Sequence, residues 1–268
     1  MQILTTIRKN VPNFFTSLSL LTGSLSIIIS VENPKNLAIA AYLILVAAVF
    51  DFVDGFAARL LDARSELGKQ LDSLSDLISF GVAPSVILYV LLKQALEIES
   101  FSFSLPFWQM AVLMSAFLVA LFSAFRLAKF NIDTRQTSKF IGLPTPASAL
   151  LIASLPLSLA YNPDMSGFLE PITTNIFYML FVIYFQKEAV NVLVLLPIIL
   201  FLSWIMVSNF QMFSLKFKNI KFKENVLRYT LVIAAIPLVI VFQPLAIFMV
   251  IMLYILLNVA NNLIWKIE

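Results

Sequence analysis

Long apolar stretches recur along the whole chain, and they constrain the fold more than any other feature. A helix needs about 20 consecutive apolar residues to cross the hydrocarbon core of a bilayer. Of the 268 residues, 60% are hydrophobic and only 12% are charged, whereas about a quarter of the residues in soluble proteins are charged. The apolar runs are continuous rather than alternating, which argues against a transmembrane β-barrel. The sequence therefore predicts an all-α fold, a polytopic integral membrane helical bundle.

We expect about eight transmembrane helices in a single integral membrane domain, residues 1–268. The expected spans are 14–31, 37–61, 71–92, 107–127, 143–161, 190–207, 229–242 and 245–264. Segment 173–185 is short, and we interpret it as interfacial or re-entrant. Six spans result if the last pair is misassigned, and nine result if the short segment crosses. Pro84 is expected to kink the third span, and no cleavable signal peptide is expected.

Positive charge is distributed unevenly between the two ends of these spans. With the N-terminus in the cytosol, fifteen of the eighteen Lys and Arg residues lie on the cytosolic side, and only Lys35, Lys93 and Lys187 lie on the other. Cytosolic loops of membrane proteins carry such an excess, so we expect segment 51–76 to face the cytosol. The basic segment 216–223 is interpreted as a lipid-headgroup anchor. No nucleic-acid partner is expected.

Four aspartates stand out in the stretch DFVDGFAARLLDARSELGKQLDSLSD. Asp51 and Asp54 are three residues apart, and Asp72 and Asp76 are four apart, so each pair shares one face of its helix. A polar turn over LDARSELGK would let the two helices run antiparallel with these faces together. Ionised carboxylates in a membrane are costly and usually face the interior of a bundle or a cavity. We therefore predict that all four converge at the cytosolic end of one helix pair.

Converging carboxylates predict a site for divalent cations. The chain has no cysteine and no histidine, so a carboxylate is the most available general base. Two divalent cations would balance four negative charges, and hard oxygen ligands suit Mg²⁺ or Mn²⁺. Two ions about 3.5–4 Å apart can clamp the attacking and leaving oxygens of a phosphoryl transfer. Asp62 and Glu66, by contrast, are interpreted as solvated helix ends.

Small residues beside the aspartates indicate a surface for a flat ligand. Gly55 lies in mid-helix, where glycine costs about 1 kcal/mol relative to alanine. Gly55 and Ala58 would leave a shallow floor where a ring could approach the backbone. Arg59, next to them, could bind a phosphate or one of the carboxylates.

The spacing of these residues resembles the signature of the CDP-alcohol phosphotransferase family, Asp-x2-Asp-Gly-x2-Ala-Arg-x8-Gly-x3-Asp-x3-Asp. The matching residues are Asp51, Asp54, Gly55, Ala58, Arg59, Gly68, Asp72 and Asp76. The resemblance implies a six-helix catalytic core in which the first three aspartates bind metal ions. It also implies that Asp76 is the general base and touches a metal. In the reaction that it implies, a CDP-linked lipid or alcohol reacts with a hydroxyl acceptor and CMP leaves.

Three further stretches are similar to the bacterial phosphatidylserine synthases of this family: LDSLSDLISFGVAPS, RLAKFNIDT and FIGLPTPAS. VPNFFTSLSLLTG is similar as well, except that Ser19 stands where the family pattern has Asn. This resemblance implies CDP-diacylglycerol and L-serine as substrates, membrane lipids around the protein, a homodimer, and the bacterial inner (cytoplasmic) membrane. The catalytic motifs then fall in residues 8–160, and residues 162–268 form a C-terminal membrane extension.

Serine would also need a partner for its carboxylate. Arg126, Lys129 and Arg135 lie at the cytosolic end of the fourth span, and arginine can bind a carboxylate through two hydrogen bonds. The same residues could instead serve only as positive-inside anchors. Asn13 and Thr16 could cap the first span or reach the nucleotide.

Two alternatives stay open on the sequence. A related transferase could use glycerol 3-phosphate or inositol phosphate as its acceptor. A cation transporter could use the carboxylates as ion ligands, although such proteins tend to bind ions at the bilayer midplane, and these aspartates lie near the cytosolic end of their spans.

Overall fold

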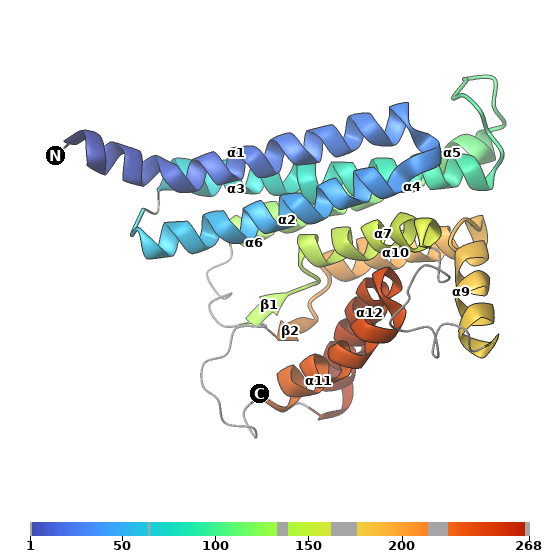
Figure 1. Cartoon of the computed structure of the whole chain (residues 1–268). Helices are drawn as coiled ribbons and strands as arrows, with labels where there is room; N and C mark the ends of the chain where they lie inside the picture. The colour runs from blue at the N-terminus through green and yellow to red at the C-terminus, as the bar shows by residue number, and fades with distance from the viewer. Residues whose placement is uncertain (1, 64, 133–138, 162–175, 214–224, 266–268) are drawn as a thin grey trace.

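In the structure, a computed structural model, the long helices of the N-terminal part of the chain run back and forth along one direction, and several of the later helices are inclined to it (Figure 1). The structure describes residues 2–63, 65–132, 139–161, 176–213 and 225–265. The helices are α1 (Gln2–Glu32), η1 (Pro34–Asn36), α2 (Leu37–Leu60), α3 (Glu66–Asp76), η2 (Leu77–Val82), α4 (Ala83–Ala95), α5 (Phe107–Ser115), α6 (Leu118–Ile132), α7 (Thr145–Ala160), α9 (Ile176–Glu188), α10 (Val192–Val207), α11 (Val226–Phe242), α12 (Pro244–Ala260) and η6 (Asn261–Trp265). The predicted all-α membrane bundle is confirmed.

Five of these helical segments are long and apolar enough to cross a membrane. They are Asn10–Glu32, Pro34–Leu60, Glu66–Ala95, Phe107–Ile132 and Pro244–Leu263. The segments Phe181–Glu188 and Val192–Val207 together form a sixth, bent by 76°. Two shorter apolar helices, α7 and α11, correspond to the remaining expected spans. At 1.5 Å per residue they are about 24–26 Å long, slightly less than the roughly 30 Å hydrocarbon core.

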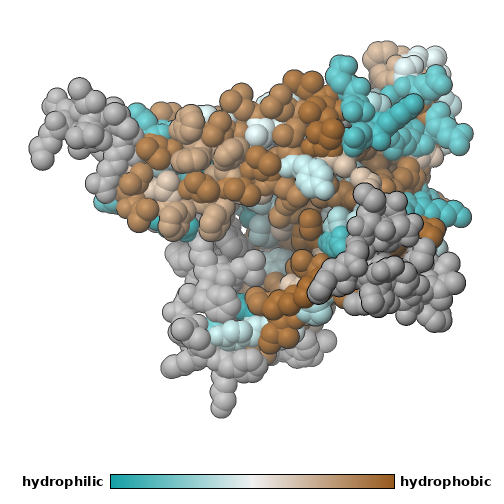
Figure 2. Space-filling model, in the orientation of Figure 1, coloured by the Kyte–Doolittle hydropathy of each residue, from teal (hydrophilic) through white to brown (hydrophobic). Residues whose placement is uncertain are grey.

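The outer surface of the bundle is apolar, as a lipid environment requires. Along α1, exposed Phe14, Leu21, Leu25 and Ile28 form a stripe on one face. Figure 2 shows this hydrophobic surface over α1 and α2, with hydrophilic residues gathered near the connection between α4 and α5. The aspartates of the sequence motif lie away from this end, where α2 ends and α3 begins.

The third span differs from its prediction in two ways. It starts earlier, at Glu66, because Ser65 caps α3 by accepting a hydrogen bond from the Gly68 backbone N–H at 3.0 Å. The expected distortion at Pro84 takes the form of a π-helical turn, Leu77–Val82, which ends two residues before the proline. Proline lacks a backbone N–H, and a π-turn is one way in which a helix accommodates the missing hydrogen bond.

Serine hydroxyls and one glycine join α1 to its neighbours. Ser19 and Ser26 donate to the carbonyl oxygens of Ala47 and Ala40 on α2, at 3.0 and 2.8 Å. Ser79, on η2, donates to the Ser19 carbonyl at 2.9 Å and lies directly against Gly23. Small residues and interhelical hydrogen bonds are the usual means by which helices associate in membranes. They bring α1, α2 and α3 together around the aspartates.

The centre of the bundle is α7, whose residues are largely buried. It packs against α2 on one side and α12 on the other, while α10 packs against α6. The helices beyond residue 162 therefore contact the helices that carry the motifs.

A two-stranded antiparallel sheet, which the sequence did not predict, lies at the end of the bundle near the start of α7. It pairs β1 (Lys139–Ile141) with β2 (Gln211–Phe213), with Phe140 opposite Met212. Both strands lie outside the expected spans, and three-residue strands leave no periodic pattern in a sequence. The basic segment 216–223, interpreted as a lipid anchor, lies outside the described residues.

The close contact between Gly23 and Ser79 gives a stability prediction. A Cβ at Gly23 would lie 2.6 Å from the Cα of Ser79, whereas a Cβ at Gly55, also in mid-helix, has no atom within 4 Å. We expect Gly23→Ala to lower stability by about 1–3 kcal/mol, as overpacking does, and Gly55→Ala to leave it unchanged or raise it. Thermal melting of the purified protein in detergent measures both, and equal melting temperatures for the two variants would contradict the packing described.

Candidate metal and nucleotide site

The aspartates are brought together by a tight connection between α2 and α3. The chain reverses through Asp62, whose φ of 46° is left-handed, and the Ala63 N–H donates to the Ala58 carbonyl at 3.0 Å. Aspartate tolerates this backbone conformation better than most residues. Gly68, expected in the turn, instead lies in the first turns of α3. The antiparallel arrangement predicted for the two helices is present (Figure 1).

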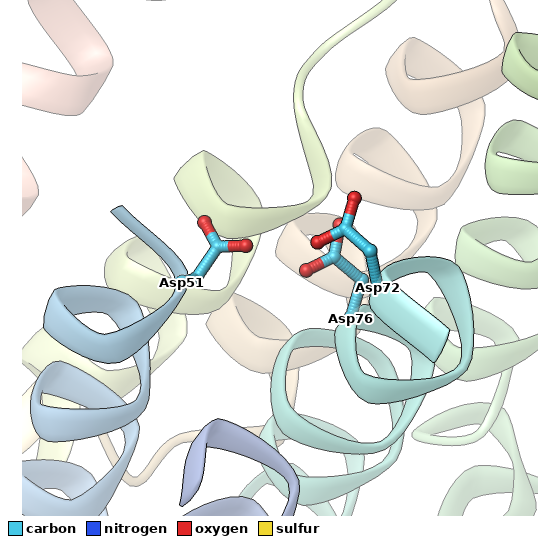
Figure 3. A group of neighbouring side chains, drawn as sticks. All are labelled: Asp51, Asp72 and Asp76. Atoms are coloured by element: carbon cyan, nitrogen blue, oxygen red, sulfur yellow. The ribbon is translucent and has the colours of Figure 1, made fainter. Parts of the chain in front are cut away.

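Three of the four aspartates form one cluster. Asp51, Asp72 and Asp76 each offer a carboxylate oxygen, and these oxygens all lie within 4.8 Å of one another. Figure 3 shows Asp51 on α2 pointing toward Asp72 and Asp76 on α3. Three carboxylates at this separation are mutually repulsive unless a proton or a cation lies among them. Their hard oxygen atoms are the donor set that Mg²⁺ or Mn²⁺ prefers, so the residues present fit a divalent metal.

Asp54 is held slightly apart from this cluster. It is buried, and its Oδ2 accepts a hydrogen bond from the Thr16 hydroxyl at 2.7 Å. Thr16 does not cap α1, because that helix begins at Gln2 rather than near residue 14. The bond instead ties α1 to the aspartate motif. We predicted that all four aspartates converge. Three of them do, and Asp54 instead lines the cavity next to the cluster.

A cavity of about 510 Å³ lies beside the cluster, between α1, α2 and α3. It is lined by Pro12, Asn13, Thr16, Asp54, Gly55, Ala58, Ala63, Ser65, Glu66, Gly68, Lys69 and Asp72. Sequence reasoning selected most of its small and polar residues but assigned no role to Lys69. Glu66, interpreted as a solvated helix end, also lines it. The carboxylates of Asp54 and Asp72 join this cavity to the cluster.

The two motif glycines have different surroundings in this cavity. An added Cβ at Gly55 would meet no atom within 4 Å, so the α2 backbone is open to a ligand there. An added Cβ at Gly68 would lie 2.9 Å from the Asn13 side-chain oxygen. Gly68 thus lets Asn13 of α1 approach α3 closely, and Gly55 leaves the floor of the cavity uncovered.

Arg126 lies on the other side of the cluster, on α6. It is buried, its guanidinium donates to the Thr145 hydroxyl at 3.0 Å, and its charge interacts with the Asp76 carboxylate. Its Nε has no hydrogen-bond partner among the described residues. The Ser148 hydroxyl, one turn beyond Thr145 on α7, is also buried without a partner in the described part of the chain. Buried polar groups without partners are rare in proteins, so these two atoms mark a place where a polar ligand would be satisfied.

The other basic residues selected from the sequence are not brought into the site. Lys129 and Arg59 are exposed, and Arg135 lies outside the described residues. A separate link joins α3 to the end of α6, where the Asn131 amide donates to the Ser73 hydroxyl at 2.8 Å and Lys69 donates to the Asn131 carbonyl at 3.3 Å. Thr145, Ser148 and Asn131 all fall within or beside the motifs RLAKFNIDT and FIGLPTPAS, which was the only sequence signal for them.

Comparison with known proteins identifies the family to which these motifs belong. The family model for CDP-alcohol phosphatidyltransferases matches residues 9–206, which reaches almost to the end of α10. A CDP-diacylglycerol–serine O-phosphatidyltransferase from Helicobacter pylori is 37% identical over 143 residues, 53% of this chain and 54% of the relative. Another from Bacillus subtilis is 38% identical over 128 residues, 48% of this chain and 64% of the relative.

An archaetidylserine synthase from Methanothermobacter thermautotrophicus is 34% identical over 161 residues, covering 59% of this chain and 62% of the relative. The chain thus spans about half to two thirds of the length of the curated relatives that it matches. The matched region extends beyond residue 160, where the sequence motifs end, and includes α9 and α10.

The cluster predicts a measurable affinity for divalent cations. Asp72 belongs to the cluster and also lines the cavity. We expect Asp72→Asn to weaken Mn²⁺ binding at least about tenfold, since even the loss of an outer partner of a metal ligand costs 10- to 100-fold. Electron paramagnetic resonance of free Mn²⁺ during titration of the purified protein measures this. The matched control is Asp62→Asn, outside the cluster. Equal Mn²⁺ affinity in the two variants would show that the cluster is not the binding site.

Proposed function

The chain belongs to the CDP-alcohol phosphatidyltransferase family, and we propose that it transfers the phosphatidyl group of CDP-diacylglycerol to the hydroxyl of L-serine, giving phosphatidylserine and CMP. The observation that carries the proposal is the cluster of Asp51, Asp72 and Asp76, with oxygens within 4.8 Å, beside a cavity of about 510 Å³. Serine as the acceptor is supported by the names of the relatives from H. pylori and B. subtilis. The family match favours a transferase over the cation transporter left open by the sequence.

The cavity suits the nucleotide end of the lipid substrate. We propose that Asn13, Thr16, Gly55, Ala58 and Gly68 surround the cytidine and its phosphates, because all five line the cavity and Gly55 leaves its floor open. The acyl chains of the substrate would extend into the membrane along the apolar surface of the bundle. Arg59 is exposed at the end of α2, where it could bind a lipid phosphate rather than the nucleotide.

Two ions of Mg²⁺ or Mn²⁺, held by Asp51, Asp54, Asp72 and Asp76, would supply positive charge against the diphosphate and against the charge that develops during transfer. The residues of the chain hold the reactants in place around them. Thr16 fixes Asp54 by its 2.7 Å hydrogen bond, and Ser75 fixes α3 against α1 by donating to the Thr16 carbonyl at 3.1 Å. Such fixed geometry is what positioning contributes to a reaction rate.

Asp76 is proposed as the general base. It accepts the proton of the serine hydroxyl, so that the serine oxygen can bond to the phosphorus that carries diacylglycerol. The bond between that phosphorus and the oxygen of the CMP phosphate breaks, and CMP leaves with the electron pair. Asp76 belongs to the aspartate cluster, and its carboxylate interacts with the charge of Arg126, which supports its role beside the proposed acceptor pocket.

Arg126 is proposed to bind the serine carboxylate. A residue that only anchors the protein by the positive-inside rule would be exposed, as Lys129 is, whereas Arg126 is buried and has a free Nε among the described residues. Arginine can present two parallel N–H groups to a carboxylate. The Ser148 hydroxyl would provide a further hydrogen bond to the same substrate.

The setting of the enzyme belongs to the same proposal. We propose a homodimer in the bacterial cytoplasmic membrane, as the resemblance implies. The site would face the cytosol, because most of the Lys and Arg residues fall on the side where α2 ends and α3 begins. The soluble substrate serine could then reach the site directly, while CDP-diacylglycerol enters from the bilayer.

The acceptor is tested by release of CMP. The purified protein in vesicles with CDP-diacylglycerol and Mn²⁺ is given L-serine, glycerol 3-phosphate or inositol phosphate one at a time. We expect serine alone to support release, with phosphatidylserine as the lipid product. Loss of a general base typically slows a reaction about 10²- to 10⁴-fold, so we expect that loss in Asp76→Asn and unchanged release in Asp62→Asn. Faster release with another acceptor would contradict serine, and undiminished release in Asp76→Asn would contradict the base.

A further inference from the structure

Three polar side chains follow one face of the last helix, and their partners lie on β2. Tyr254, Asn258 and Asn262 are spaced four residues apart along α12 and η6, so they share a face. We call these three residues the polar ladder. They lie beyond residues 9–206, the region matched by the family model.

The polar ladder binds the backbone of β2 on the edge that β1 leaves free. At Phe213, the Asn258 side-chain oxygen accepts from the N–H at 2.7 Å and the Tyr254 hydroxyl donates to the carbonyl at 3.0 Å. At Gln211, Asn262 accepts from the N–H at 3.1 Å and donates to the carbonyl at 2.7 Å. Four backbone groups of a strand edge are thus satisfied by side chains of one helix, where water or another strand would ordinarily do so.

The contacts continue from β2 to the start of α7. Met212 of β2 lies opposite Phe140 of β1. The next residues after β1 are also fixed, because the Gly142 N–H donates to the Phe210 carbonyl at 2.9 Å and the Leu143 N–H donates to the Ile205 carbonyl at 3.2 Å. Gly142 has a φ of 75°, a left-handed conformation that glycine adopts without strain. The ladder therefore fixes the segment that leads into Thr145.

Thr145, the first residue of α7, connects this segment to Arg126. Arg126 donates to the Thr145 hydroxyl at 3.0 Å. At the other end of the chain of contacts, the Tyr254 hydroxyl donates to the Phe213 carbonyl at 3.0 Å. The ring of Tyr254 also packs edge-on against Phe213, with centroids 5.1 Å apart.

From this chain of contacts we propose that the polar ladder is a positioning device for the acceptor pocket, and that Tyr254 is a positioning residue for Arg126. The inference rests on the proposed function, in which Arg126 binds the acceptor carboxylate. It gives the helices beyond the family match a role in acceptor binding, distinct from the nucleotide cavity on the opposite side of the aspartate cluster.

The test compares Tyr254→Phe with Tyr42→Phe in the full chain. Tyr42 is exposed on α2 and makes no side-chain hydrogen bond within the described residues, so its variant should match the wild type. Tyr254→Phe keeps the ring and removes one hydroxyl. Loss of such a hydrogen bond corresponds to about a 3- to 10-fold effect. We expect the KM for serine to rise by that factor, while the KM for CDP-diacylglycerol stays unchanged. Asn262→Ala, at the far end of the ladder, should show the same selective rise.

A double-mutant cycle separates positioning from general destabilisation. If Tyr254 acts through Arg126, Tyr254→Phe should have little further effect on the serine KM in an Arg126→Lys background. Additive effects, a wild-type serine KM in Tyr254→Phe, or parallel losses for both substrates would each overturn the proposal.

The outcome can be told apart from failure of the proposed function. If the wild type uses another acceptor, the assignment of serine is wrong. The role of the polar ladder is then tested by whether Tyr254→Phe raises the KM for that acceptor. If no acceptor is found, hydrogen exchange at the Gly142 and Leu143 amides is the readout. It should speed up in Tyr254→Phe and Asn262→Ala but not in Tyr42→Phe, and equal exchange in all three would overturn the proposal.

Discussion

Mutual repulsion among the carboxylates of Asp51, Asp72 and Asp76, whose oxygens lie within 4.8 Å, is the constraint on which the arrangement of the helices depends. Ionised carboxylates are costly in a membrane protein and are usually found where they have a functional partner. Two of the three come from one helix and the third from its antiparallel neighbour, so their repulsion favours separation of α2 and α3. Contacts with other helices must therefore hold the two helices together. The rest of the N-terminal bundle provides that support.

The support comes from small residues and serine hydroxyls on α1. Gly23 allows α1 to lie directly against η2, Ser75 and Ser79 donate to carbonyls of α1, and Thr16 binds Asp54. In lipid there is little hydrophobic force between helices, so close packing and hydrogen bonds of this kind determine which helices associate. The same contacts that stabilise the bundle thereby fix the geometry of the candidate site. Other small residues, Gly55, Ala58 and Gly68, line the cavity beside it.

Much of this arrangement could be predicted from the sequence, because its signals are local. The long apolar runs predicted the spans, and the spacing of Asp51, Asp54, Asp72 and Asp76 predicted a shared face on each of two helices. Gly55 and Ala58 of the same stretch were expected to leave an open floor, and both line the cavity. What the sequence missed depends on contacts between distant segments. The β1–β2 pair is only three residues long on each side, and the polar ladder of α12 gives no signal until β2 is placed beside it. The start of the third span was also missed, because the Ser65 cap sets it. The π-helical turn at Leu77–Val82 within that span was not predicted either.

Locating the ions would show whether the aspartate cluster is a site for divalent cations. Crystals of the protein grown with Mn²⁺ and measured near the manganese absorption edge would give anomalous difference peaks at bound manganese. We expect two peaks, both within coordination distance of carboxylate oxygens of Asp51, Asp54, Asp72 and Asp76, and about 3.5–4 Å apart as in other two-metal sites. Peaks elsewhere with none at these aspartates, in a protein that binds Mn²⁺ in solution, would contradict a metal site at this cluster.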